Sequence, residues 1–254
     1  MADVSGPSAG VRRLAELIGE SECTVALTGA GVSVPSGIPD FRTPETGLWA
    51  NVDPMEVAHI DVFERDPARF WAFYGQRFAT LRDKRPNGAH AALAELERRG
   101  IVDAVVTQNI DGLHRMAGTG DLIEVHGSIA TSSCLACGAS YALDDARSRL
   151  AAAQDGVPRC DCGEPLKPDV VLFGEFLPEA ALARASRLAS EADVLLCVGS
   201  SLEVYPVAGL PELTLSGGGA LAIVTKGPTP YDRAAEVKLD GDVVAELDAV
   251  LAAL

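Results

Sequence analysis

Two close pairs of cysteines form the clearest metal-ligand pattern in the chain. Cys134 and Cys137 are separated by two residues, and Cys160 and Cys162 are separated by one. Two thiolate pairs at a distance along a chain are typical of a tetrahedral zinc site, and four protein thiolates leave no position for a substrate. Disulfides or free thiols are the alternative, which a reducing compartment disfavours. The pattern therefore predicts one structural zinc ion.

A glycine-rich segment follows a short apolar run near the N-terminus. The run 23–27 leads directly into TGAGVSVPSGIPDFR, residues 28–42. Glycines at the end of a strand let the backbone turn tightly and approach a pyrophosphate without a Cβ atom in the way. Val34 and Pro35 stand where the dehydrogenase fingerprint has its third glycine, so this is not a clean motif of that class. We expect a rigid, polar loop here.

Polar residues follow two further apolar runs. TQNIDGLH (residues 107–114) follows the run 102–106, and GSSL (residues 199–202) follows the run 194–198. In open parallel sheets, ligands bind at the carboxyl ends of the strands. His126 lies in EVHGS, residues 124–128, and an imidazole suits a general base because its ordinary pKa is close to neutral pH. Taken alone, a histidine between Val and Gly is more often structural.

Together these segments resemble the NAD-binding and catalytic motifs of the sirtuin family, and the resemblance extends from about Val11 to the last predicted helix. It implies that NAD is a co-substrate and that acyl groups are removed from protein lysines, giving nicotinamide and O-acyl-ADP-ribose. Two alternatives stay open. Mono-ADP-ribosyl transfer to proteins uses the same bond cleavage with another acceptor, and the chain could bind NAD without catalysis.

The resemblance also implies catalytic roles. His126 would act as general base on a ribose hydroxyl, Asn109 would hold the ribose and Asp111 the nicotinamide amide. An alternative for the segment from Asn109 to Asp111 is a turn that caps the next helix, and His114 is expected to be structural.

The residues expected to contact NAD lie in the same motifs and near the C-terminus. Arg42 could instead pair with Glu45 at the surface. Thr225 stands where the family usually has asparagine, so the adenosine contact is expected to differ. The expected NAD contacts are Gly29, Ala30, Gly31, Ser33, Asp40, Phe41, Arg42, Gln108, Asn109, Ile110, Asp111, Gly199, Ser200, Ser201, Thr225, Asp242 and Val243.

The segment VVLFGE, residues 170–175, is similar to the family segment that pairs with an acyl-lysine peptide as an added strand. Residues 201–204 would flank the peptide on its other side. A buried core strand is the alternative, which Pro168 and Gly174 at its ends disfavour. The expected substrate contacts are Val171, Phe173, Gly174, Glu175 and Val204.

Tyr74 and Arg77 are three residues apart in a predicted helix, 67–81, and therefore share a face. A Tyr-x-x-Arg pair at this place binds the distal carboxylate in sirtuins that remove succinyl and malonyl groups, and a guanidinium suits a carboxylate. The alternative is a helix that packs aromatic side chains, because phenylalanines surround the pair. The sequence leaves the preference between acetyl and acidic acyl groups open.

Strand-like and helix-like segments alternate along most of the chain. This alternation predicts a doubly wound, Rossmann-like parallel sheet. The predicted strands are 23–27, 102–106, 194–198 and 221–224, and the predicted helices are 11–18, 89–99, 179–189 and 242–251.

Residues 40–86 and 131–168 break the alternation. We expect them to form a smaller inserted module, helical and zinc-ribbon-like, while residues 1–39, 87–130 and 169–254 form the larger part. The cleft between the two parts would be the ligand site. The whole chain, 1–254, is expected to be a single catalytic unit.

The amino-acid composition limits the classes of partner that we expect for this protein. The net charge of −15 over 254 residues argues against a nucleic-acid partner, because phosphate binding needs a basic face. No apolar run is long enough to cross a bilayer, and residues 1–10 do not resemble a signal peptide. We expect a cytoplasmic protein whose partners are proteins bearing acyl-lysine; the sequence does not determine the oligomeric state. Cys23 and Cys197, within apolar runs, are expected to be buried thiols.

Overall fold

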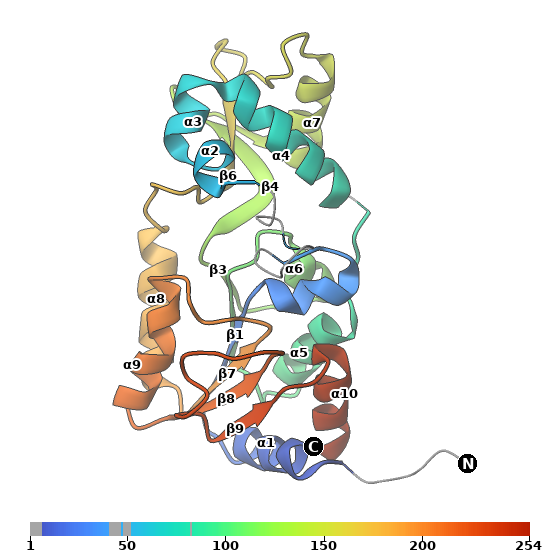
Figure 1. Cartoon of the computed structure of the whole chain (residues 1–254), viewed down its shortest axis with the longest axis vertical. Coiled ribbons are helices and arrows are strands. Elements are labelled where there is room, and N and C mark those ends of the chain that lie inside the picture. The colour runs from blue at the N-terminus through green and yellow to red at the C-terminus, as the bar shows by residue number, and fades with distance from the viewer. Residues whose placement is uncertain (1–6, 41–46, 48–51, 82) are drawn as a thin grey trace, which may run out of the picture.

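The computed structural model of the chain describes residues 7–40, 47, 52–81 and 83–254 (Figure 1). Within them, a six-stranded parallel sheet has the strand order β3-β2-β1-β7-β8-β9. The chain moves outward in one direction from β1 and in the other from β7, so the topological switch point lies between these two strands. Ligands of open α/β sheets bind there. The strands are β1 (Thr24–Thr28), β2 (Ala104–Thr107), β3 (Leu122–Glu124), β7 (Val194–Val198), β8 (Ala220–Val224) and β9 (Val237–Leu239).

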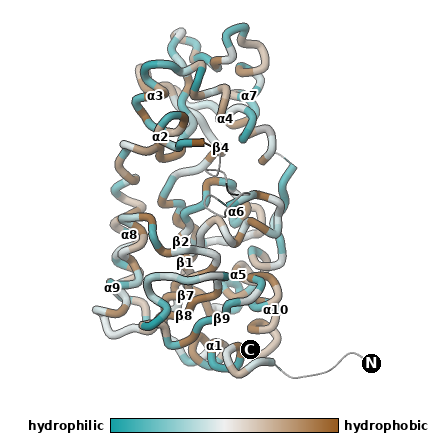
Figure 2. The backbone as a smooth tube through the Cα atoms, in the orientation of Figure 1, coloured by the Kyte–Doolittle hydropathy of each residue, from teal (hydrophilic) through white to brown (hydrophobic). Residues whose placement is uncertain are grey.

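Helices cover both faces of this sheet, and the predicted doubly wound architecture is confirmed (Figure 1). Alternate residues of β1 point to opposite faces, so Ala26 packs with one helix layer while Val25 and Leu27 pack with the other. Figure 2 shows the hydrophobic colour concentrated on the central strands. One layer holds α1 (Ala9–Gly19), α5 (Gly88–Arg98) and α10 (Val243–Ala253), and the other holds α8 (Glu179–Glu191) and α9 (Leu210–Ser216).

A three-stranded antiparallel sheet lies beyond the carboxyl ends of the parallel strands (Figure 1). Its neighbouring core is aromatic: the ring of Phe70 lies 5.2 Å from that of Phe63, 5.8 Å from that of Trp71 and 4.5 Å from that of Tyr74. The few aromatic residues of the chain thus concentrate in this smaller module. Its elements are α2 (Pro54–Val57), α3 (Ile60–Arg65), α4 (Pro67–Leu81), β4 (Gly127–Cys134), β5 (Ser140–Ala142), α7 (Leu143–Ala152) and β6 (Leu166–Val170).

Local sequence signals explain several boundaries. The side chain of Ser8 accepts a hydrogen bond from Val11 N at the start of α1, and that of Asp242 accepts from Val244 N and Ala245 N at the start of α10. Asp242 therefore begins the last helix, as predicted. The predicted helix 67–81 is also confirmed, with the same bounds.

Other expectations need correction. The segment after Gly29, expected to be a rigid, polar loop, forms a 3₁₀ helix, η1 (Ala30–Ser36). The fixed φ of Pro35 is compatible with it, and Gly37 N closes it by donating to Val34 O. Cys197 is fully buried, but Cys23 is only partly buried because β1 begins one residue after it. None of the helices that the structure describes is both long and apolar enough to cross a bilayer.

Candidate functional site

A cavity of about 870 Å³ lies at the carboxyl ends of the parallel strands, where the loops after β1, β2, β7 and β8 meet the segment after β6. Segments far apart in sequence meet here, at the switch point between β1 and β7. Most predicted site residues line it: Gly29, Ala30, Gly31, Asp40, Tyr74, Arg77, Gln108, Asn109, Ile110, His126, Val171, Phe173, Gly174, Glu175, Gly199, Ser200, Ser201, Val204, Thr225, Asp242 and Val243.

Four predicted residues are not among those lining the cavity. Phe41 and Arg42 lie outside the described residues. Ser33 and Asp111 hydrogen-bond to each other, with Ser33 Oγ donating to Asp111 Oδ2 at 2.7 Å. Asp111 Oδ1 accepts from Leu113 N at 2.9 Å, which is the capping turn considered as the alternative.

Asn109 connects this pair to the cavity wall. It is 7% exposed, and its Nδ2 donates to Gly29 O and to Ser33 Oγ, each at 3.1 Å. These two bonds fix the orientation of the side-chain amide. Asp111 thus supports Ser33, and Ser33 in turn supports Asn109.

Two of the predicted glycines, Gly31 and Gly199, lie so close together that a Cβ atom at either position would clash with the other loop. Gly31 N donates to Gly199 O at 2.8 Å, and a Cβ atom on Gly31 would lie 2.7 Å from the same oxygen. Gly199 has φ of 60°, and a Cβ atom there would lie 2.3 Å from Val32 N. The loops after β1 and β7 therefore pack backbone against backbone, which only glycine permits. The sequence interpretation considered only the approach of a ligand.

His126 lies between β3 and β4, and its Nδ1 is 3.1 Å from the carbonyl oxygen of Gln108. A carbonyl only accepts, so Nδ1 carries the proton and Nε2 is the unprotonated nitrogen of a side chain that lines the cavity. Burial lowers the pKa of His126 below its ordinary value of 6.5. The imidazole is therefore neutral at pH 7 and able to accept a proton.

A second, fully enclosed polar network supports the same loop. Nε2 of His114 lies 2.9 Å from Thr28 Oγ1, which donates to Thr107 Oγ1 at 2.8 Å. Thr107 Oγ1 also accepts from Asn109 N at 3.1 Å. Burial lowers the pKa of His114 to about 3. This network confirms the structural interpretation of His114.

His90 is a supporting residue that the sequence analysis missed. Its ring lies 4.8 Å from that of His114, and its Nε2 is 3.4 Å from Ser33 Oγ. Its Nδ1 accepts from Asn87 N in a capping box at the start of α5. The Asn-x-x-His spacing of Asn87 and His90 was the signal that could have indicated it.

The backbone after β6 is tied on one side to the smaller module. Phe173 N donates to Ala58 O at 3.0 Å, and Ile60 N donates to Phe173 O at 2.9 Å. Val171 N donates to His126 O at 2.9 Å. β6 itself ends at Val170, so the segment 171–175 continues as an irregular loop along the cavity rather than as a core strand.

Tyr74 and Arg77 both line the cavity from α4, and Tyr74 also packs in the aromatic core of the smaller module. Tyr74 is 7% exposed and stacks on Phe70 in the aromatic core. Burial raises the pKa of Tyr74 to about 12 and lowers the pKa of Arg77. The guanidinium still carries its charge, because arginine stays protonated in proteins.

Ten further residues that line the cavity were not among the individually predicted contacts, although Val170 and Leu172 belong to the predicted substrate segment 170–175. Most are immediate neighbours of predicted residues, so the motifs could have indicated them. Ala58 and Pro228 belong to segments without a motif and carried no signal. The ten are Val34, Pro35, Ala58, Val170, Leu172, Leu177, Tyr205, Lys226, Pro228 and Gly241.

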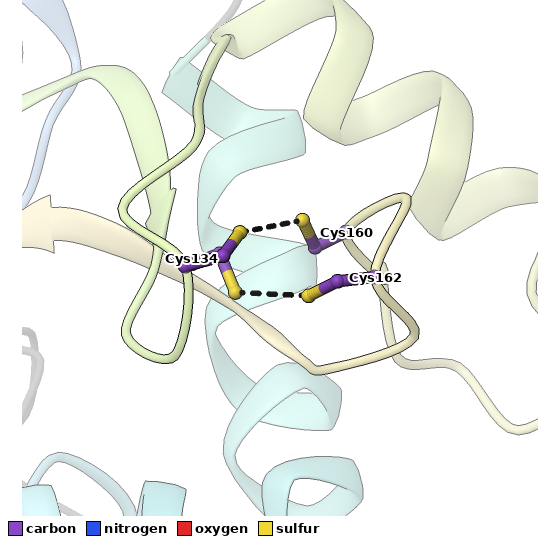
Figure 3. A group of neighbouring side chains, drawn as sticks. Cys134, Cys160 and Cys162 are labelled. Atoms are coloured by element: carbon purple, nitrogen blue, oxygen red, sulfur yellow. Dashed lines mark hydrogen bonds between the residues drawn. The ribbon is translucent and has the colours of Figure 1, made fainter.

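The four cysteines of the predicted metal site converge. Figure 3 labels three of them, with Cys134 facing Cys160 and Cys162 across the site. Their sulfur atoms all lie within 4.8 Å of one another, with separations of 3.6 Å for Cys134–Cys162 and 3.5 Å for Cys137–Cys160. A tetrahedral zinc ion with Zn–S bonds of about 2.3 Å requires separations of roughly 3.8 Å, whereas a disulfide requires about 2.05 Å. The arrangement fits zinc and not disulfides.

Two glycines shape the loops that carry these cysteines. Gly138 and Gly163 have φ of 75° and 96°, and their N–H groups donate to Cys134 O and Cys160 O. Such left-handed residues let each loop fold back on itself. In the sequence, each of these glycines directly follows a cysteine pair.

Comparison with known proteins shows to which family the chain belongs. A sequence model of the Sir2 family matches residues 29–206. The chain is 46% identical over 228 residues to the NAD-dependent protein deacetylase of Sulfolobus acidocaldarius, covering 89% of this chain and 88% of that protein. It is 43% identical over 235 residues to the protein of the same name from Thermotoga maritima, covering 92% and 94%.

Solved structures agree with these sequence matches. A complex of Sir2 with a p53 peptide and NAD⁺ has a TM-score of 0.86 and 41% identity, covering 94% of this chain and 96% of that one. A structure of Sir2 bound to acetylated peptide has a TM-score of 0.87 and 40% identity, covering 95% and 97%. The chain belongs to the Sir2 family, the family of the sirtuins.

Proposed function

We propose that this protein removes acyl groups from protein lysines in an NAD-dependent reaction, and that the cavity at the switch point is its active site. One observation carries the proposal: a neutral imidazole, that of His126, lines the same cavity as the glycine turns after β1 and β7 and the segment 171–175. The relatives named NAD-dependent protein deacetylase and the Sir2 complex with acetylated peptide support it.

The residues of the chain divide the work between binding and proton transfer. NAD supplies the ribose carbon that accepts the acyl oxygen when nicotinamide leaves. The loops Gly29–Gly31 and Gly199–Ser201 line the cavity and would bind the phosphates of NAD there, and Asn109, with its amide fixed, would position the ribose. His126 would take the proton of a ribose hydroxyl at Nε2. Because Gln108 O holds Nδ1–H, the nitrogen that accepts the proton is defined.

The cysteine site would have a structural role. With four thiolate ligands the zinc ion would be closed to substrate, and it would join the β4–β5 turn to the loop before β6. Its contribution is to the stability of the smaller module, which supplies Tyr74, Arg77 and the anchor of Phe173 to the cavity.

We further propose that the acyl pocket accepts acyl groups with a distal carboxylate, such as succinyl and malonyl, in addition to acetyl. Support comes from Arg77, a half-buried cation on the cavity wall one helical turn from Tyr74. The carboxylate of Asp111 also favours the charged form of Arg77, so an acidic acyl group would share this cation with a protein carboxylate.

The test is turnover of acyl-lysine peptides. Purified protein is incubated with NAD and peptides carrying acetyl-, succinyl- or malonyl-lysine, and the release of nicotinamide and O-acyl-ADP-ribose is followed by mass spectrometry. We expect NAD-dependent deacylation by the native protein and a rate lower by about 10²- to 10⁴-fold in His126→Ala. Absence of deacylation with every peptide would refute the proposal, and labelling of proteins by NAD would instead support mono-ADP-ribosyl transfer.

A further inference from the structure

A buried lysine lies next to the substrate segment without lining the cavity. Lys167, on β6, is 7% exposed. Its Nζ lies 2.9 Å from Val170 O, 3.3 Å from Pro168 O and 2.9 Å from Glu175 Oε2. An ammonium has three N–H donors, and these three acceptors use all of them. A buried charge is tolerated only when it is paired and hydrogen-bonded in this way.

The partner carboxylate extends this arrangement into the segment 170–175. Glu175 Oε2 accepts a second hydrogen bond, from Leu172 N at 2.8 Å. Lys167 therefore holds the start of the segment through Val170 O and its end through Glu175, and Glu175 also holds the middle. Glu175 was predicted to contact substrate; in the structure its carboxylate turns toward Lys167 and Leu172 instead, while the residue still lines the cavity.

The segment held by Lys167 is hydrogen-bonded to the backbone of His126, the proposed base. Val171, which follows the carbonyl held by Lys167, donates its N–H to His126 O at 2.9 Å. The opposite edge of the segment is fixed by the bonds of Phe173 to Ala58 and Ile60. A displacement at Val170 or Glu175 would therefore move the cavity-lining backbone of Phe173 and Gly174 relative to His126.

We propose that Lys167 is a positioning residue for catalysis. Through Val170 O and Glu175 it fixes the position, relative to His126, of the segment 170–175 that would bind the acyl-lysine peptide. This inference rests on the proposed function, because it takes segment 170–175 to bind the substrate. It assigns Lys167 no contact with the substrate or with NAD. Loss of Lys167 should thus weaken use of the peptide while NAD binding is preserved.

The test compares Lys167→Met and Glu175→Gln with the native protein. Methionine keeps most of the side-chain volume without the ammonium, and glutamine keeps an oxygen that can accept from Leu172 N. We expect Lys167→Met to raise the KM for an acetyl-lysine peptide by about ten- to a hundredfold, which corresponds to a loss of about 1.4–2.8 kcal/mol in peptide binding when the segment is no longer positioned. The Kd for NAD should stay within about twofold. Glu175→Gln should raise KM in the same direction but by less.

A second measurement needs no substrate. Hydrogen–deuterium exchange of a peptide covering residues 170–175 should be at least about tenfold faster in Lys167→Met, because Val170 O and the Glu175 carboxylate, which accepts from Leu172 N, are no longer held by the ammonium. Arg184→Met is the matched control, since it breaks the exposed pair of Arg184 with Asp121 outside the cavity. Its peptide KM and its exchange in this segment should equal those of the native protein.

Native KM and native exchange in Lys167→Met would overturn the proposal, as would an equal loss of affinity for NAD and peptide. If Lys167→Met does not fold, Glu175→Gln decides, and native KM with native exchange in that variant would overturn it. Failure of the proposed function is recognised separately, as a native protein that deacylates no peptide. The exchange measurement would still test whether Lys167 holds the segment.

Discussion

The carbonyl oxygen of Gln108 and Nδ1 of His126 lie 3.1 Å apart, which joins the loop after β2 to the residue between β3 and β4. The contact fixes the tautomer of the imidazole, and the side chain of Gln108 donates to Ser200 Oγ at 2.9 Å on the loop after β7. Gln108 thus links the proposed base to the nucleotide side of the cavity. The protonation state of His126 follows from this geometry together with its burial.

His126 should determine the acid limb of the pH profile. A general base must be unprotonated, and burial lowers its pKa below 6.5. Deacylation should therefore be constant around pH 7 and fall, approaching tenfold per pH unit, only below a pKa that is itself lower than 6.5. The measurement is kcat/KM for an acetyl-lysine peptide from pH 5 to 8. A midpoint at or above pH 7 would contradict the neutral, buried imidazole.

Replacing His126 tests its role directly. His126→Ala should lower deacylation by about 10²- to 10⁴-fold, the usual contribution of a general base, while NAD binding persists because the glycine loops are unchanged. Binding is measured by calorimetry and turnover by nicotinamide release. Turnover close to that of the native protein would remove His126 from the mechanism.

The buried His114 should make the fold sensitive to acid. Its pKa is lowered to about 3 in the folded state, whereas in the unfolded chain it is near 6.5. Between these values the unfolded chain binds a proton that the folded protein does not, so the free energy of unfolding falls as pH decreases, by about 1.4 kcal/mol per unit. The stability that neutral His114 contributes is complete above pH 6.5 and is lost progressively toward pH 3.

His114→Gln removes this ionisable group and should flatten the slope of unfolding free energy against pH by about that amount. Urea denaturation at several pH values between 4 and 7 measures the slope. The m-value should stay constant, which shows that the unfolded state has not changed. Equal slopes in the native protein and the variant would mean that His114 is protonated in the folded state as well.

Loss of a zinc ligand should release the metal and destabilise the protein. Cys162→Ser removes one of the four thiolates, and a structural zinc ion contributes folding free energy directly. A loss of several kcal/mol would lower Tm on the order of 10 °C, since 1 kcal/mol shifts Tm by about 2–4 °C in domains of this size. Metal analysis should find one zinc per chain in the native protein and less in the variant.

Cys23→Ser provides the control, because Cys23 is a free thiol outside the cluster. Its zinc content should match that of the native protein. A natively purified, folded protein without zinc would contradict the assignment of the site.

Much of the fold could be predicted because the central strands are long apolar runs with ligand-binding motifs directly after them. β3 and β9 were missed because each has only three residues, too few to show a hydrophobic period. Helix α6 (Leu113–Ala117) has only five residues, and the sequence indicated it only through the alternative of a capping turn from Asn109 to Asp111. The helix 67–81 has fifteen residues and an apolar face, so its bounds were predicted correctly.

The sequence predicted the side chains of the candidate site better than the backbone contacts that hold its loops together. Sequence motifs indicated His126 and Asn109 as site residues. The need for glycine at both 31 and 199, however, arises from a backbone contact between loops far apart in sequence. The ion pair between Lys167 and Glu175 likewise depends on how the chain turns after β6. Such relationships become visible only when the loops are placed in space.

Arg77 should determine the preference for acidic acyl groups. If its guanidinium meets the distal carboxylate of a succinyl group, the charge-assisted pair contributes about 1.5–3 kcal/mol. Arg77→Met should then lower kcat/KM for succinyl-lysine by roughly ten- to a hundredfold. Acetyl-lysine has no such carboxylate, so its kcat/KM should barely change or should rise.

The comparison between substrates distinguishes recognition from packing. Arg69→Met is the matched control, because Arg69 lies on the same helix α4 but pairs with Glu56 at the surface. It should leave both substrates unaffected. An equal loss for acetyl- and succinyl-lysine in Arg77→Met would instead assign Arg77 a structural role in the cavity wall that it shares with Tyr74. The enzyme would then be a deacetylase without a preference for acidic acyl groups.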